Sequence, residues 1–306
     1  MYDDRARSGI AFFRYDRAAF DIRTGGPTMT QRLQTLQTEV RDGVAVVTMA
    51  RERVRNAFNE SMIGELDAAF GELGADAAVR AIVLAGRGPV FCAGADLEWM
   101  ARMADFTAEE NRRDALQLAR MLRTIHECPK PTLARVHGDA YGGGLGLVAA
   151  CDMAFAARGA AFCLSEAKLG LIPATIGPYV VRAIGRRQAL RYFQTAERFD
   201  GPEALRIGLV HALVAPERLD ACISEVLEAL SQTSPQAARE AKRLVHDIAG
   251  QPLTERLLAD TADRIAAARG SEDGREGVRA FLQKRKPRWQ VGRASAPGAR
   301  DDDEEM

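Results

Sequence analysis

Short apolar runs bounded by turn signals recur along the first two thirds of the chain, and each predicts a buried strand. The stretch Leu36–Met49 holds two β-like runs broken at Asp42-Gly43, a dipeptide typical of hairpin turns. The predicted buried strands are Val44–Met49, Ala81–Ala85, Thr132–Val136, Met153–Ala157 and Ala161–Leu164. Because such runs leave no polar face, they indicate a sheet that is covered on both sides.

Stretches with helical spacing separate these runs. Asn59 is placed to cap a helix that runs to about Leu73, and Thr107 to cap one that ends near Glu127. After Ile176 the pattern predicts helices only, in these segments: Tyr179–Ile184, Gly185–Thr195, Pro202–Ile207, Pro216–Leu230, Pro235–Ile248, Leu253–Ala268 and Glu272–Lys284. Strands that alternate with helices predict an α/β fold with largely parallel pairing. We therefore expect an α/β core over residues 29–200 and a helical region over residues 201–290.

The two ends of the chain differ from this pattern. Residues 1–28 mix acidic, basic and aromatic side chains and end in Gly25-Gly26-Pro27, which predicts a disordered extension. Residues 291–306 finish in five consecutive acidic residues, Asp301 to Glu305, which predicts a disordered, solvated tail.

Composition narrows the function classes. The 306 residues carry a formal net charge of +0 and are 47% hydrophobic, so they give no electrostatic case for nucleic acid or a membrane surface. Five cysteines are scattered without metal-type spacing, and four histidines share none; they are Cys92, Cys128, Cys151, Cys163, Cys222, His126, His137, His211 and His246. We expect reduced thiols, a cytoplasmic protein, no metal and no separate cofactor.

Three consecutive glycines, Gly142, Gly143 and Gly144, follow the predicted strand Thr132–Val136 and precede a short apolar helix, Leu145–Ala150. Glycine lets a backbone approach a ligand closely, and a helix that begins there directs free N–H groups at an anion. The spacing fits neither a dinucleotide fingerprint nor a phosphate loop. Taken alone, such a run is more typical of close packing of a helix on a strand.

Four segments in order resemble the enoyl-CoA hydratase/isomerase (crotonase) superfamily. They are Arg55–Asn59, Phe91–Asp96, Gly138–Asp152 and Phe162–Pro173, and the resemblance extends over roughly Leu33 to Trp289. It implies a spiral of ββα turns followed by a helical trimerisation region, and a homotrimer that often pairs into a hexamer.

The resemblance also implies a catalytic set. Backbone N–H groups of Ala95 and Gly143 would hold the thioester oxygen of an acyl-CoA, and Glu166 would move protons. A donor pair that meets growing negative charge lowers the barrier by roughly 3–4 kcal/mol per donor. The chain departs from the two-glutamate pattern at Gly146, where hydratases of the family carry a second Glu. That departure puts the reaction type in question more than the substrate class.

The segment Ala174–Pro178 resembles the methylglutaconyl-CoA hydratase group of bacterial leucine degradation. We therefore expect hydration of an enoyl-CoA, with 3-methylglutaconyl-CoA as the leading substrate and Thr175, Tyr179 or Arg182 as partners for its distal carboxylate. The alternatives are a Δ3-Δ2 enoyl-CoA isomerase that uses the single Glu, and a non-catalytic CoA- or RNA-binding relative.

The same resemblance predicts contacts to CoA. In the first half of the chain they are Arg53, Arg55, Ala57, Ala93, Gly94, Asp96, Leu97 and Gly142. Near the end, Phe281 and Lys284 resemble residues of the family's closing helix, which reaches the CoA of a neighbouring subunit. Lys286 and Arg288 beside them are read as a solvated charged face.

Overall fold

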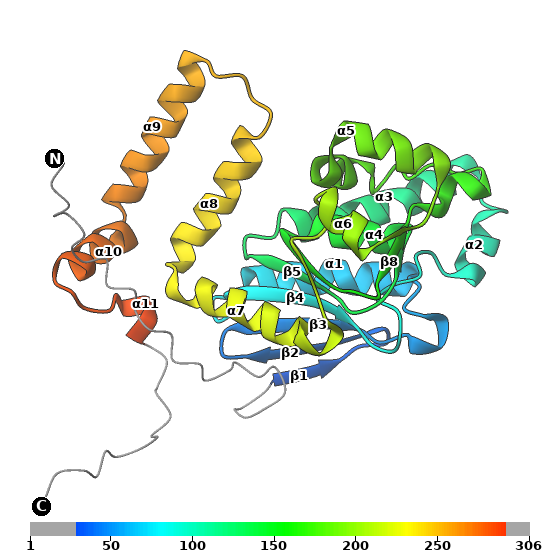
Figure 1. Cartoon of the computed structure of the whole chain (residues 1–306), viewed down its shortest axis with the longest axis horizontal. Coiled ribbons are helices and arrows are strands. Elements are labelled where there is room, and N and C mark those ends of the chain that lie inside the picture. The colour runs from blue at the N-terminus through cyan, green and yellow to red at the C-terminus, as the bar shows by residue number, and fades with distance from the viewer. Residues whose placement is uncertain (1–28, 292–306) are drawn as a thin grey trace, which may run out of the picture.

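The computed structural model describes residues 29–291 of the chain. The predicted extension (residues 1–28) and almost all of the predicted tail (residues 292–306) lie outside the described residues. Figure 1 shows a layered α/β body at one end of the molecule and, at the opposite end, helices that stand away from the sheet. Within the described residues, no helix combines the length and the apolar character needed to span a membrane.

A seven-stranded sheet forms the centre of the body. Its order is β1 (Met29–Arg32), β2 (Leu36–Arg41), β3 (Val44–Met49), β4 (Ala81–Gly86), β5 (Thr132–Val136), β7 (Met153–Ala157) and β10 (Ala212–Val214). The first three strands pair antiparallel, and all later neighbours pair in parallel. A second sheet of three strands joins β6 (Ala140–Tyr141), β8 (Ala161–Cys163) and β9 (Phe199–Asp200).

The hairpin predicted at Asp42-Gly43 is confirmed. Asp42 (φ 49°) and Gly43 (φ 79°) both adopt positive φ, as a two-residue turn with the twist of a hairpin requires. The register that follows pairs Arg41 with Val44 and Leu36 with Met49.

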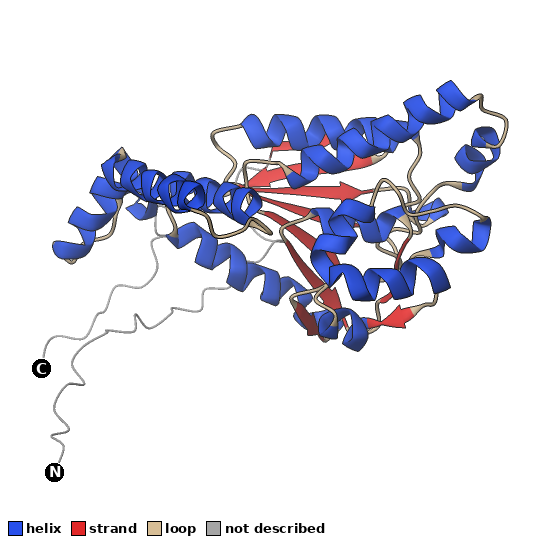
Figure 2. Cartoon of the chain, turned by 90° about the horizontal axis from the view of Figure 1, so that it is seen from above, coloured by secondary structure: helices blue, strands red, loops and turns tan. Residues whose placement is uncertain are grey.

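Both faces of the sheet are covered by helices, as the apolar runs predicted (Figure 2). Alternate residues of β3 and β4, among them Val47 and Leu84, face one core with α1 (Glu60–Ala75), α3 (Ala108–His126), α4 (Gly143–Ala150) and α5 (Gly177–Thr195). Their neighbours Val44 and Val83 face a second core under α7 (Leu219–Gln232). The side-chain period of two thus divides one apolar run between two layers.

The predicted helix caps also hold. The side chain of Asn59 accepts the Met62 N–H at 3.2 Å. Thr107 and Glu110 form a reciprocal capping box at the start of α3. A short helix, α2 (Leu97–Met103), follows the Phe91–Asp96 segment.

The expectation of helices only after Ile176 is wrong at two places. The strands β9 and β10 lie in this part of the chain, and β10 pairs in parallel with β7. Both strands are too short to show a period-two pattern in the sequence. They are recognised only by the strands with which they pair. The sheet and its covering helices α6 (Gly201–Arg206) and α7 therefore draw on residues beyond 200. The two helices predicted over 179–195 form one run that is kinked at Gly185 (φ 74°, ψ 158°).

The C-terminal arm, by which we mean α8 (Pro235–Ile248), α9 (Glu255–Gly270) and α10 (Glu272–Leu282), stands away from the sheet layers (Figure 1). No side chain of α8 or α9 is buried. One ion pair fixes the arm to the body: Lys242 Nζ lies 2.8 Å from Asp152 Oδ2. The same carboxylate oxygen accepts the backbone N–H and the hydroxyl of Thr132 at 2.8 and 3.0 Å. Short turns η1 (Glu52–Val54), η2 (Ser165–Leu169) and η3 (Pro216–Arg218) and a last helix, α11 (Arg288–Val291), complete the described fold.

Candidate active site

Three segments that are far apart in sequence meet at the N-terminus of α4. Cys92 and Ala140 form a parallel bridge, in which the Cys92 N–H donates to Asp139 O at 3.1 Å. A second parallel bridge joins Phe58 and Ala95, in which the Phe58 N–H donates to Gly94 O at 2.8 Å. These bridges align the segments 56–59, 91–96 and 138–144 side by side.

The same bridges leave two backbone donors unused. Ala95 is the central residue of its bridge, so its own N–H points away from Phe58, while the flanking Gly94 and Asp96 make the hydrogen bonds. Gly143 is the first residue of α4, and its N–H has no partner within the helix. Within residues 29–291, neither N–H has a hydrogen-bond acceptor. Both groups are therefore free to hold an oxyanion, the role predicted for them.

The glycines are required by close contacts. A Cβ atom added to Gly143 would lie 2.0 Å from Cζ of Phe58, and one added to Gly144 would lie 2.6 Å from the Cys92 carbonyl oxygen. Gly142 has φ 49°. Close packing and an exposed helix N-terminus, which the sequence left as alternative explanations, are thus two properties of the same backbone.

The carboxylate of Glu166 lies directly over this backbone. Glu166 belongs to the turn η2, which follows β8, and a Cβ added to Gly142 would lie 3.3 Å from its Oε1. The hydroxyl of Ser165 lies 3.9 Å from the same point. The other carboxylate oxygen, Oε2, is buried and has no hydrogen-bond partner among the described residues.

Burial also sets the proton affinity of this group. Loss of solvent raises the pKa of Glu166, and a hydrogen bond from its own backbone N–H opposes the rise only in part. A carboxylate with an elevated pKa suits proton transfer near neutral pH. The geometry therefore brings Ala95, Gly143 and Glu166 to one place, and their catalytic roles stay a prediction.

Asp96 has a use inside the chain. Its Oδ1 accepts the N–H groups of Glu98 and Trp99 at 2.9 and 3.3 Å and so caps α2. Its Oδ2 lies 3.0 Å from Nη2 of Arg51, a residue that sequence reasoning did not select. Burial would raise the pKa of Asp96, but these hydrogen bonds and the Arg51 guanidinium outweigh burial and lower it. The carboxylate thus holds the loop that carries Ala95.

The other predicted CoA contacts fall into two groups. Ala57, Ala93, Gly94, Leu97 and Gly142 lie on the bridged segments or directly beside them, and Leu97 is 80% exposed. Arg53 and Arg55 are exposed on η1 and at its end.

Phe281 and Lys284 do not join this group. Phe281 is 81% exposed on α10, and Lys284 (φ 53°) follows that helix, at the end of the molecule away from α2 and α4 (Figure 1). Within one chain they do not complete the site.

Sequence reasoning also passed over Asn56, which positions the loops. Asn56 is fully buried, and its Nδ2 donates to the carbonyl oxygens of Arg87 and Val90 at 2.8 and 3.0 Å. Its Oδ1 accepts the Arg51 N–H at 3.0 Å. An Asn inside a recognised motif was the available signal, because Asn adopts positive φ more readily than most residues, and in the structure Asn56 has φ 54°.

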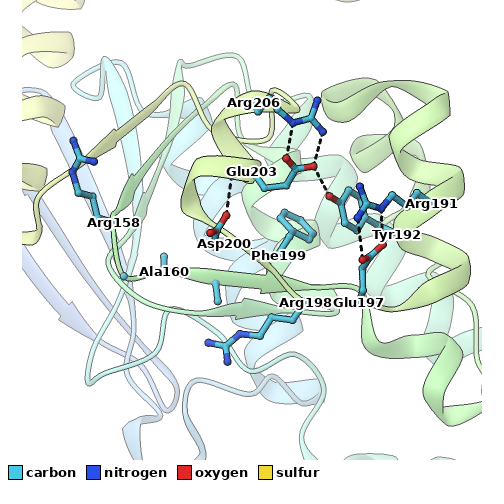
Figure 3. A pocket seen from close by; sticks show the side chains of 12 residues that line it. Arg158, Ala160, Arg191, Tyr192, Glu197, Arg198, Phe199, Asp200, Glu203 and Arg206 are labelled. Carbon is cyan, nitrogen blue, oxygen red and sulfur yellow. Dashed lines mark hydrogen bonds and ion pairs between the residues drawn. The ribbon is translucent and has the colours of Figure 1, made fainter.

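Two of the hollows in the described part of the chain have charged or aromatic linings and lie apart from these residues. One of about 750 Å³ is bounded by β9, α5 and α6 (Figure 3). Four of its charged side chains pair with each other: Arg191 Nε lies 2.6 Å from Glu197 Oε1, and Arg206 binds Glu203. Because no predicted site residue lines this hollow, we assign it no role in the chemistry.

The other hollow, of about 1120 Å³, lies beneath α8. Tyr179 and Arg182, proposed above as partners for a distal carboxylate, line it together with His126 and His246. The rings of these two histidines stack with centroids 4.3 Å apart. His211 accepts the Ala154 N–H, and His137 contacts the Gly88 carbonyl at 2.8 Å, so the four histidines serve the packing of the fold. Across residues 29–291, no group of three or more His, Cys, Asp or Glu side chains is arranged to hold a metal ion.

Comparison with known proteins agrees with this geometry. The family model for enoyl-CoA hydratase/isomerase matches residues 39–292. The chain belongs to the enoyl-CoA hydratase/isomerase family. A curated relative from Thermus thermophilus, whose name assigns it provisionally as an enoyl-CoA hydratase, is 36% identical over 247 residues, which cover 80% of this chain and 97% of the relative.

Solved structures of the family extend the agreement to three dimensions. An enoyl-CoA hydratase from Shewanella pealeana is 41% identical, with a TM-score of 0.82 over 84% of this chain and 97% of that one. An enoyl-CoA hydratase/isomerase from Marinobacter aquaeolei is 37% identical, with a TM-score of 0.79 over 84% of this chain and 100% of that one. The predicted crotonase-like α/β fold is thereby confirmed, and the chain is an enzyme of this type.

Proposed function

We propose that this enzyme adds water across the 2,3 double bond of an enoyl-CoA thioester. The observation that carries the proposal is the carboxylate of Glu166. Its Oε1 stands over Gly142, near two free backbone N–H groups, and its Oε2 is buried without a hydrogen-bond partner among the described residues. A buried carboxylate without a partner is costly unless a ligand supplies one. A water molecule would supply it here.

The chemistry follows from that arrangement. Glu166 removes a proton from water as the water oxygen forms its bond to the β-carbon. The electron pair of the double bond moves to the thioester oxygen, where the N–H groups of Ala95 and Gly143 stabilise the enolate. Glu166 then returns the proton to the α-carbon, which restores the carboxylate and completes the addition of water.

We propose 3-methylglutaconyl-CoA as the substrate. Support comes from the segment Ala174–Pro178 and from Gly146, which together resemble the hydratases of that ester. Arg182 and Tyr179, the partners expected for its distal carboxylate, line the hollow beneath α8 and not the group formed by Ala95, Gly143 and Glu166, so their position adds no support.

Isomerisation of a 3-enoyl to a 2-enoyl thioester is the second candidate. A single carboxylate can carry a proton between the α- and γ-carbons, and α4 (Gly143–Ala150) supplies no second acid, since all of its side chains are apolar or absent. Binding without catalysis, of CoA or of RNA, is disfavoured by the place of Glu166, whose carboxylate lies over Gly142 near the free N–H groups of Ala95 and Gly143, and burial there also raises its pKa.

A spectrophotometric assay tests the proposal. The absorbance of the conjugated thioester is followed with 3-methylglutaconyl-CoA, crotonyl-CoA and a 3-enoyl-CoA, for the wild type, Glu166→Gln and the control Glu109→Gln on the exposed start of α3. Hydration consumes the absorbance of a 2-enoyl ester, whereas isomerisation creates it from a 3-enoyl ester. We expect Glu166→Gln to reduce kcat by roughly 10²–10⁴-fold and the control to match the wild type. Equal rates in all three proteins would refute the role of Glu166.

We further propose that the enzyme assembles as a trimer or a hexamer and acts in the cytoplasm. Large apolar side chains are exposed on its arm and on the loop that joins α8 to α9: Val245, Leu253, Leu258, Ile265, Val278, Phe281 and Leu282. So many exposed apolar side chains in one part of the molecule indicate a protein contact. All five cysteines are free thiols, four of them buried, which supports a reducing compartment.

A further inference from the structure

Glu166 and Ile176 cover successive turns of one face of α4. The Gly146 N–H donates to Gly142 O at 3.2 Å, so these two residues are one helical turn apart and lie on the same face. Glu166 Oε1 stands over Gly142. Over Gly146 stands Ile176, because a Cβ added to Gly146 would lie 2.1 Å from Cγ2 and 2.7 Å from Cβ of that side chain.

The side chain of Ile176 has little freedom to withdraw. It is 2% exposed and belongs to the main core. Its carbonyl oxygen accepts the N–H groups of Tyr179 and Val180, both at 3.1 Å, which fixes the backbone at the start of α5. A β-branched side chain held in this way keeps one χ1 rotamer. Ile176 is therefore a rigid wall.

We propose that Ile176 is the residue that determines which acyl groups this site accepts. The proposal rests on the function proposed above, in which the acyl carbons lie between the oxyanion donors and Glu166. Gly142 and Gly146, which the two side chains cover, are one turn of helix apart, a rise of about 5.4 Å along the axis. Because Glu166 acts at the α- and β-carbons in the proposed reaction, the neighbouring Ile176 wall would lie beside the substituents of the β-carbon.

Two consequences follow for the chemistry. The side chain of Ile176 fills the space in which a second carboxylate on α4 would stand, so proton transfer is left to Glu166. The wall is also apolar and fixed, so it limits the bulk of the group attached to the β-carbon. A pocket that differs by one or two methyl groups discriminates substrates by roughly 10–200-fold.

The test compares the binding of two saturated thioesters, which need no turnover. Butyryl-CoA carries one methyl group on its β-carbon, and 3,3-dimethylbutyryl-CoA carries three. The ratio of their dissociation constants is measured by calorimetry for the wild type, Ile176→Ala, Ile176→Val and the control Ile184→Ala. Ile184 offers the same side chain, also buried, two turns further along α5.

We expect Ile176→Ala to shift this ratio by about tenfold or more toward the bulkier ester, because its wall is gone, and Ile176→Val to shift it by less. Ile184→Ala should lower stability and leave the ratio as in the wild type. A ratio that stays within twofold in both Ile176 variants, or that shifts equally in Ile184→Ala, overturns the proposal. Ile176→Val keeps the test valid if Ile176→Ala does not fold.

The outcome is separable from that of the proposed function. A wild-type enzyme that binds both saturated esters and hydrates no 2-enoyl ester would refute hydration. The ratio of dissociation constants would still test whether Ile176 limits the acyl group. Conversely, an active enzyme whose ratio does not respond to Ile176 would refute the wall alone.

Discussion

The segment around α4 and the C-terminal arm differ in how closely their side chains are packed. At α4, backbone and side chains meet so closely that a single methyl group on Gly143 or Gly146 would overlap Phe58 or Ile176. On α8 and α9, no side chain is buried, although large apolar groups are present. One region is packed within a single chain, whereas the other leaves apolar side chains exposed, which the proposed assembly would cover. Placement of the reacting groups and the proposed contact with a partner thus belong to different parts of the sequence.

The largest effect is expected for a substitution in the closely packed region around α4. Gly143→Ala should force Phe58 or the start of α4 to move, because the new methyl group would lie 2.0 Å from Cζ of Phe58. Displacement of one oxyanion donor should reduce kcat by roughly 10²–10³-fold. Overpacking should also lower the free energy of unfolding by about 1–3 kcal/mol. Steady-state kinetics and chemical denaturation measure the two effects.

Gly159→Ala is the matched control for that change. A Cβ added to Gly159 meets nothing within 4 Å, so both kinetics and stability should equal those of the wild type. If the two alanine variants behaved alike, the close packing at Gly143 would not be what positions the donor.

Charged substitutions on the exposed apolar face of the C-terminal arm should weaken self-association. Leu258 and Ile265 lie seven residues apart on α9 and are 53% and 50% exposed, so they share one face. We expect Leu258→Glu/Ile265→Glu to weaken self-association by at least about tenfold, which corresponds to about 1.4 kcal/mol. Light scattering across a concentration series should show a lower mass for this variant. Leu116→Glu, a charge on a half-exposed leucine of α3, serves as the control and should keep the wild-type mass.

The smallest effect is expected at His126, which lies where α8 contacts the body of the molecule. There the stability of the protein should depend on pH. Burial lowers the pKa of His126, and the neighbouring His246, Lys242 and Arg182 lower it further, while Asp152 acts in the opposite direction. Tyr179 completes the ring contacts, with its centroid 5.1 Å from that of His126. The unfolded chain therefore binds this proton first as the pH falls. The contribution of neutral His126 to stability is complete above about pH 6.5 and declines as the pH falls toward the folded pKa.

This dependence is isolated by difference. Denaturation of the wild type and of His126→Phe is compared at intervals from pH 7.5 to pH 5. Glu166, whose raised pKa acts in the opposite sense, is common to both proteins and cancels. The stability of the wild type relative to the variant should fall over this range. A difference that is constant with pH would show that His126 does not titrate as its surroundings require.

Much of the fold could be predicted because the information was local. Strands buried on both faces show as continuous apolar runs, and Asn59 and Thr107 mark helix starts by their own chemistry. The span predicted for α8 matches the observed one residue for residue. By contrast, β10 exists because β7 offers it a partner, and three residues carry no readable period.

The candidate site divides in the same way. Glu166 and the three glycines were found through motifs with fixed spacing along the chain. Ile176 was missed because its role depends on contact with Gly146, a residue thirty positions earlier. Asp96 was read as a ligand contact, although an aspartate directly before an apolar helix start is a known capping signal. Contacts between distant segments are what the sequence pattern does not encode in a readable form.

The ion pair between Lys242 and Asp152 has a consequence for how copies of this enzyme would meet. The two side chains are only 11% and 18% exposed, and removal of one partner from such a pair typically costs about 3–5 kcal/mol. The first helix of the arm is therefore held at one angle before any encounter. A neighbouring copy would meet α8 in an orientation that is already fixed relative to the sheet. The fold of each subunit would therefore determine the symmetry of an assembly.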